Sequence, residues 1–188
     1  MKLFNGLFAA ILITGLFAFL PGPVNASPQF DLLKAVDDAD VEELNKLLGK
    51  GVSPDTRRKT SGEPAIIIAA NNGSLKIMKI LLEHGARADY ADRTRGETAL
   101  MRRALVGDAA MIKLLLEHGA DPNRADIGQE TALIKAVRGK KSKAVQALLE
   151  AEADPNVQDL TGKTALDYAK LSRNRRLIKM LQDAGANS

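Results

Sequence analysis

The fold is decided by the stretch GETALMRRALVGDAAMIKLLLEHGADPN, residues 96–123. Thr98 is a good N-cap residue and begins a short predicted helix that Gly107 ends. A second helix is predicted after it, because apolar residues recur on one helical face: Met111, Ile112, Leu115 and Leu116. Gly119 then stands where a helix C-terminus favours a left-handed residue, and residues 121–123 predict a turn. Two helices this short cannot bury their apolar faces alone, so they need neighbours.

Those neighbours are copies of the same stretch. Alignment on its Thr-Ala-Leu anchor gives spacings of 34, 33 and 33 residues between Pro64, Thr98, Thr131 and Thr164. Twenty-one residues after the anchors stand Gly85, Gly119, Glu152 and Gly185. Phe30 and Gly51 have the same separation in a degenerate first copy. A period of 33 residues with helix, turn, helix and extended loop resembles the ankyrin repeat.

The resemblance implies an all-α fold. It would be an ankyrin-repeat solenoid of about five helix-turn-helix repeats with β-hairpin finger loops and capping repeats at both ends. The repeats are predicted at about 27–60, 61–93, 94–126, 127–159 and 160–188. The acidic first repeat fits the polar outer face that a terminal repeat needs. Because Glu152 replaces a helix-ending glycine, we expect that helix to end differently or to be strained.

Residues 1–26 resemble a secretory signal peptide. Lys2 gives a short basic start, residues 7–20 are almost wholly apolar, and small residues at Val24 and Ala26 predict cleavage after Ala26. The mature chain, residues 27–188, would then be periplasmic or secreted. The alternative is an uncleaved membrane anchor, for which the apolar run is a little short.

Composition and motifs argue against an enzyme. The chain has no cysteine, and its two histidines, His84 and His118, occupy equivalent places before a helix-ending glycine, where they complement the helix dipole. No metal site, nucleophile elbow or phosphate loop is recognisable, so we predict no catalytic residue, no metal and no cofactor. The net charge of +4, which falls to +3 without Lys2, and the few aromatic residues also argue against nucleic-acid binding.

The candidate site is a surface. Where the ankyrin pattern has an apolar residue followed by Ala, this chain has Arg102 and Arg103, and Lys135 in the next repeat. We expect these side chains to extend outward into the concave groove that first helices line in ankyrin-like stacks, beside basic fingers. An acidic partner protein would fit that surface, although the charges could also be ordinary solvated surface. The predicted partner-binding residues are Arg57, Arg58, Lys59, Tyr90, Arg93, Arg95, Arg102, Arg103, Leu105, Val106, Lys135 and Arg138.

The resemblance favours a non-catalytic, protein-binding function. We expect an exported monomer, without stable membrane insertion after cleavage, that inhibits, protects against or assists a periplasmic enzyme. The alternative is an envelope structural component tethered by an uncleaved leader. A third class is small-molecule or anion binding in the basic groove.

Overall fold

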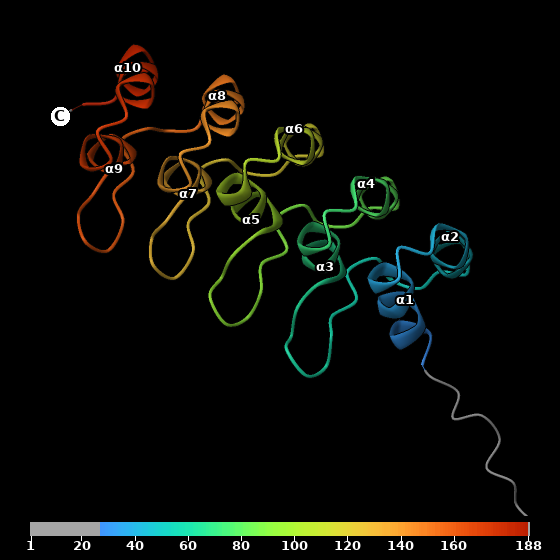
Figure 1. The fold of residues 1–188 in the computed structure, drawn as a ribbon. Helices are drawn as coiled ribbons and strands as arrows, with labels where there is room; N and C mark the ends of the chain where they lie inside the picture. The colour runs from blue at the N-terminus through green and yellow to red at the C-terminus, as the bar shows by residue number, and fades with distance from the viewer. Residues whose placement is uncertain (1–26, 188) are drawn as a thin grey trace, which may run out of the picture.

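The computed structural model describes residues 27–187, so the predicted signal peptide lies outside the described residues. Five helix-turn-helix pairs are stacked side by side in this range (Figure 1). The inner helices are α1 (Pro28–Asp37), α3 (Ala65–Asn71), α5 (Ala99–Val106), α7 (Ala132–Arg138) and α9 (Ala165–Leu171). The outer helices are α2 (Val41–Gly49), α4 (Leu75–Glu83), α6 (Ala109–Glu117), α8 (Ser142–Glu150) and α10 (Arg175–Asp183). The prediction of an all-α repeat solenoid is confirmed.

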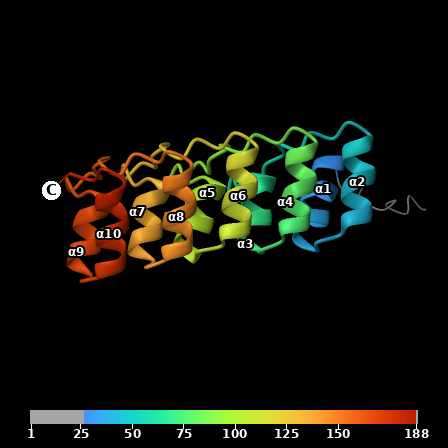
Figure 2. The same cartoon turned by 90° about the horizontal axis from the view of Figure 1, so that it is seen from above.

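The two sets of helices form two rows, which Figure 2 shows from above. Four loops join each outer helix to the next inner helix and project beyond the inner row (Figure 1). We call them fingers 1 to 4; they comprise residues 50–64, 84–98, 118–131 and 151–164. Single antiparallel bridges close finger 1, between Arg57 and Pro64, and finger 3, between Ala125 and Thr131. Within residues 27–187 the fingers contain no longer strand pairing.

The repeated threonines begin the inner helices as predicted. The hydroxyl of Thr98 accepts a hydrogen bond from the backbone N–H of the third residue of α5, and Thr131 and Thr164 do the same for α7 and α9. Each cap satisfies one of the N–H groups that a helix start leaves without a partner. The anchor motif therefore sets where every inner helix begins in the last three repeats.

The core is continuous, and its last layer ends in polar residues. Ile134 and Val137 of α7 are at most 1% exposed, because the fifth repeat covers them. One repeat later, the same positions of α9 are Asp167 and Lys170. Polar residues at stacking positions are typical of a C-terminal capping repeat. Residues 27–187 thus share one continuous core.

Side chains also join successive repeats through the loops that follow the outer helices. The Asn123 side chain accepts from the N–H of Asp154 at 2.7 Å, and Asn156 accepts from the N–H of Asn187 at 2.8 Å. Asp89 accepts in the same way from the N–H of Asp121. These bonds fix the register of one repeat on the next.

Glu152 ends its helix by the same geometry as the glycines. Its φ is +60°, against +81° for Gly119, and the N–H of Ala153 bonds back to the carbonyl of Leu148. The helix therefore does not end differently, and the expected strain is present. A left-handed non-glycine residue costs about 1–2 kcal/mol.

Candidate functional site

The inner helices and fingers bring together an unexpected set of charges. The Arg102 guanidinium lies 2.8 Å from Asp92, 3.1 Å from Glu63 and 3.4 Å from Glu97. The Lys135 ammonium lies 2.9 Å from the same Glu97. We call the connected set the ion-pair ladder; it comprises Glu63, Asp92, Glu97, Arg102, Asp126, Glu130, Lys135 and Arg138.

The same arrangement of a finger aspartate and an inner-helix residue recurs in three repeats. One carboxylate oxygen of Asp92, Asp126 or Asp159 accepts backbone N–H groups of its own finger. The other oxygen contacts the residue four positions after the next anchor: Arg102, Lys135 and Tyr168 in turn. Arg102, Lys135 and Tyr168 therefore each bond a finger to the inner helix that follows it.

Burial and hydrogen bonding act in opposite directions on these carboxyl groups. Burial alone would raise the pKa of Asp92, but the bonds from the Arg95 N–H, Arg102 and Thr94 lower it to about 2. For Asp159, burial is outweighed by the Tyr168 hydroxyl and Thr161, and the pKa is again about 2. Both carboxylates are therefore ionised in the folded protein at neutral pH.

Lys135 is the central cation of the ladder. Burial would lower its pKa, yet Asp126, Glu97 and Glu130 together raise it well above the usual value. The residue is 7% exposed. Its charge is consequently neutralised within the chain, and little of it faces a partner.

The expectation that Arg103 and Lys135 extend outward is wrong. Lys135 is buried because three carboxylates surround it. Arg103 is 8% exposed, and its buried Nε has no hydrogen-bond partner. Burial lowers the pKa of Arg103, with a smaller opposing effect of Asp108. The other repeats have alanine at this position: Ala35, Ala69, Ala136 and Ala169.

Basic residues at the base of finger 1 are also engaged. The Arg57 guanidinium stacks on the Tyr90 ring at 3.6 Å, and Arg87 covers the same ring at 3.8 Å. Arg58 pairs with Asp37 at 2.9 Å. The stacking of Arg57 on Tyr90 joins the first and second repeats, and these contacts leave Arg57, Arg58 and Tyr90 only partly available.

The remaining predicted residues are exposed. Lys59, Arg93 and Arg95 lie in the turns of fingers 1 and 2. Leu105 and Val106 are 48% and 54% exposed at the end of α5, as expected. Arg138 contacts Glu130, yet half of its side chain is exposed.

The sequence-based prediction missed exposed aliphatic side chains, among them Ile127 in finger 3, Leu160 in finger 4 and Leu171 at the end of α9. Leu105, Arg138 and Leu171 each stand seven residues after an anchor. We call them the inner-helix stripe. The repeat alignment could have identified Leu171 from Leu105, because equivalent positions face the same side of the solenoid.

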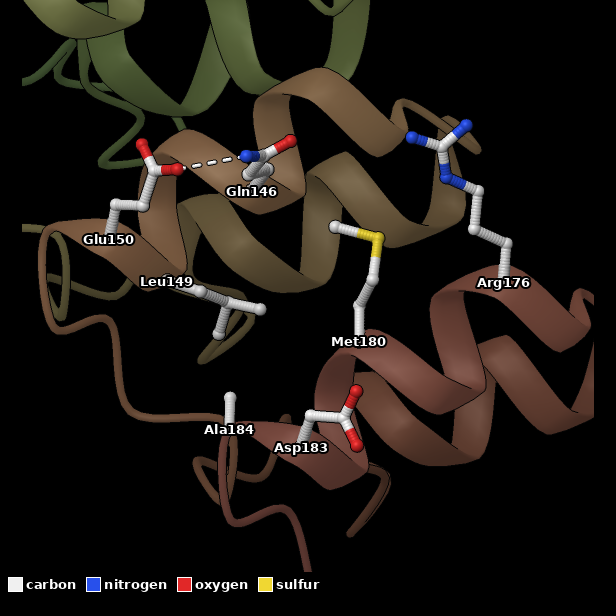
Figure 3. Close-up of a pocket in the computed structure, with 7 residues that line it drawn as sticks. All are labelled: Gln146, Leu149, Glu150, Arg176, Met180, Asp183 and Ala184. Carbon is white, nitrogen blue, oxygen red and sulfur yellow. Dashed lines mark hydrogen bonds between the residues drawn. The ribbon is translucent and has the colours of Figure 1, made fainter.

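Away from the fingers, a shallow groove of about 480 Å³ separates α8 from α10 (Figure 3). Leu149, Met180 and Ala184 provide its apolar atoms, and Gln146 donates a hydrogen bond to Glu150 at its edge. Arg176 and Asp183 complete its lining. Neither this groove nor any other part of residues 27–187 gathers three His, Cys, Asp or Glu side chains suited to a metal ion. The carboxylates of the ladder already contact arginine or lysine.

Comparison with known families agrees with this architecture. The profile "Ankyrin repeats (3 copies)" matches residues 32–126, which is more than half of the chain. The chain belongs to the ankyrin-repeat family. A second profile, "Ankyrin repeats (many copies)", matches residues 115–169. A search of curated proteins gave no significant match. Ankyrin repeats mediate binding to other proteins and are in general non-catalytic scaffolds. The exposed surface of the repeats is therefore the candidate functional site.

Proposed function

We propose that the chain is an exported ankyrin scaffold that binds another protein across the inner-helix stripe. The observation that carries the proposal is the exposure of Leu105 and Leu171, at 48% and 67%, at equivalent ends of two inner helices. Leu105 and Leu171 occupy the same position of the repeat, so their exposed side chains face the same side of the stack. Val106 extends the apolar area beside Leu105.

Arg138 lies between the two leucines in repeat order and supplies the charge of the stripe. Its guanidinium lies 5.6 Å from the centre of the Tyr168 ring and also contacts Glu130. Packed helices lie about 8–10 Å apart, so the stripe extends over roughly 20 Å. We therefore infer a partner segment with two apolar side chains flanking an acidic or hydrogen-bonding group.

The ion pairs of Arg102 and Lys135 bear on whether an acidic surface of the partner binds at these two residues. Arg102 and Lys135 face carboxylates of this chain, and the ladder holds five carboxylates against three cations, so an approaching acidic surface would meet excess negative charge there. Recognition through Leu105 and Leu171 leaves the ladder intact, and Arg138, which contacts Glu130 within the ladder, keeps half of its side chain exposed. The partner remains a protein, but apolar contact becomes the main source of affinity.

Export and a periplasmic partner are part of the proposal and rest on the sequence of residues 1–26. Mass spectrometry of the protein from its native cell is the direct test. A chain beginning at Ser27 would support cleavage and export. A retained leader would instead favour the tethered structural component. Whether a bound enzyme is inhibited, protected against or assisted follows from its activity with and without the scaffold.

The binding experiment uses residues 27–188 as bait in a periplasmic extract, followed by measurement of the dissociation constant for the captured protein. We expect the pair Leu105→Glu and Leu171→Glu to weaken binding by at least 100-fold, since buried anchors dominate such interfaces. Leu75→Glu is the matched control, because Leu75 is 42% exposed at the start of outer helix α4. Full affinity in the stripe variant, or an equal loss in the control, would contradict the proposal.

A further inference from the structure

The tips of the four fingers form a second surface, separate from the inner-helix stripe. The tip turns are residues 59–61, 93–95, 127–128 and 160–162. Fingers 1 and 2 carry exposed basic residues there: Lys59, Arg93 and Arg95. Fingers 3 and 4 carry Ile127 and Leu160, which are 67% and 72% exposed. We call these five side chains the finger-tip row.

Acidic side chains near the fingers are directed away from the tips. Asp92, Asp126 and Asp159 are at most 9% exposed, because each closes its own finger and bonds to an inner helix. The ladder engages the glutamates that precede the anchors. Lys59, Arg93 and Arg95 form no ion pair within residues 27–187. Positive charge at the tips is therefore uncompensated.

Backbone hydrogen bonds join the tips of fingers 2, 3 and 4 to one another. The N–H of Ile127 donates to the carbonyl of Arg95 at 2.9 Å, and the N–H of Leu160 donates to the carbonyl of Gly128 at 3.0 Å. Figure 1 shows all four turns projecting from the same edge, with their ends along a nearly straight line. A straight row of protruding turns can touch a flat surface along its whole length.

We propose that the finger-tip row binds the surface of an anionic lipid bilayer. Lys59, Arg93 and Arg95 would contact headgroup phosphates, while Ile127 and Leu160 would enter the boundary between headgroups and acyl chains. Basic residues with aliphatic neighbours are the combination that interfacial binding requires. Separate protruding side chains enter a fluid surface without a matching pocket, whereas a folded partner must supply one for each tip.

The expected affinity is that of a reversible peripheral protein. Each basic residue at an anionic surface contributes about fivefold, and each aliphatic side chain contributes roughly tenfold when it leaves water. Together the five side chains strengthen binding by a factor on the order of 10⁴ over a protein that lacks them. No helix within residues 27–187 is long and apolar enough to cross a membrane.

The test is flotation of residues 27–188 with vesicles, which isolates the row from the apolar leader. This segment contains every residue of the continuous core described above. Vesicles of equal parts phosphatidylglycerol and phosphatidylcholine should retain the protein at low salt, and phosphatidylcholine vesicles should not. Arg93→Glu with Arg95→Glu should reduce binding at least 25-fold, and Ile127→Ser with Leu160→Ser about 100-fold. Retention should also fall as ionic strength rises.

Matched controls lie on the outer helices. Lys76→Glu with Lys113→Glu makes the same change in net charge at exposed positions of α4 and α6, and Leu75→Ser removes an exposed aliphatic side chain. Circular dichroism checks that all variants fold. Equal losses in row and control variants, or no preference for anionic vesicles, would overturn the proposal.

Soluble polyglutamate distinguishes an acidic protein surface from lipid. If polyglutamate displaces the protein from vesicles completely and the aliphatic variants bind vesicles normally, charge alone explains the binding and the lipid assignment is wrong. The Leu105→Glu and Leu171→Glu pair should lose affinity for the captured protein but still bind vesicles. That result would show that the two proposed surfaces act independently.

Discussion

Lys135 of α7 and Asp126 of finger 3 lie 2.8 Å apart, and this contact fastens the finger to the helix that follows it. Glu97 of the preceding repeat lies 2.9 Å from the same ammonium group. One buried cation therefore joins two repeats. In a solenoid, where each repeat contacts only its neighbours, the strength of such joints determines cooperativity.

Lys135→Met should destabilise the protein by about 3–5 kcal/mol, because it leaves three carboxylates around a position without a cation. Urea unfolding followed by circular dichroism measures the change. Lys143→Met on α8 is the control, since Lys143 is exposed and makes no ion pair with described residues. Equal stability of the two variants would show that the ladder contributes nothing.

The acid sensitivity of the fold follows from Asp92 and Asp159. Their pKa values are lowered from 3.8 to about 2, so their contribution to stability is present above pH 4 and is lost as the pH falls toward 2. A shift of this size corresponds to roughly 2 kcal/mol for each group. Asp159→Asn should flatten the stability profile between about pH 5 and pH 2. Asp183→Asn, at an exposed residue of α10, is the control for the removal of one carboxyl group.

Arg102 and Arg103 are adjacent, but their replacement should have opposite effects. Arg102→Leu breaks contacts to Glu63, Asp92 and Glu97 and should destabilise the fold by about 2–4 kcal/mol. Arg103→Ala removes a buried Nε without a hydrogen-bond partner, at a position that is alanine in the four other repeats. We expect stabilisation by about 1 kcal/mol. Thermal unfolding of both single variants checks the signs, and a destabilised Arg103→Ala would show that the arginine stem fills needed space.

The fold could be predicted because its signals are local and repeated: the threonine caps, the helix-ending glycines and the constant spacing of the anchors. The ladder could not be predicted from single positions, since the partners of Lys135 come from two fingers and two repeats. A signal was present nonetheless. Glutamate precedes Pro64, Thr98 and Thr131, and aspartate stands five or six residues before Thr98, Thr131 and Thr164. Aligned with the basic residues four positions after the anchors, this pattern indicates charge compensation rather than a basic groove.

Asp89→Asn should stabilise the protein. Burial raises the pKa of Asp89 and outweighs the bond from the Asp121 N–H and the charge of Arg124, which lower it, while the Asp121 charge adds a smaller raising effect. Its equivalents are Asn123 and Asn156, whose amide groups also donate to the carbonyls of Glu152 and Gly185. An asparagine at position 89 could donate to Gly119 in the same way. We expect a gain of about 0.5–1.5 kcal/mol at pH 7.

The pH dependence of the stability gain distinguishes the loss of the Asp89 charge from the new hydrogen bond. Since the folded pKa of Asp89 is raised, its penalty is absent at low pH and grows as the pH rises through that pKa. The advantage of Asp89→Asn should therefore shrink in acid. An advantage that is equal at pH 3 and pH 7 would assign the gain to the new hydrogen bond alone.

Gly139, at the end of α7, sets how closely α5 and α7 approach. A Cβ atom there would lie 2.4 Å from the carbonyl oxygen of Leu105, which is backbone and cannot rotate away. Gly139→Ala should therefore separate the two inner helices and destabilise the protein by about 1–3 kcal/mol. Gly49→Ala in α2 is the matched control, because no atom lies within 4 Å of its added Cβ, and it should stabilise the fold by about 0.5–1 kcal/mol. Since Leu105 and Arg138 flank this contact, Gly139→Ala should also change partner affinity, which the binding assay for the stripe would measure. Stability equal to that of the parent protein would show that the stack accommodates the methyl group by sliding.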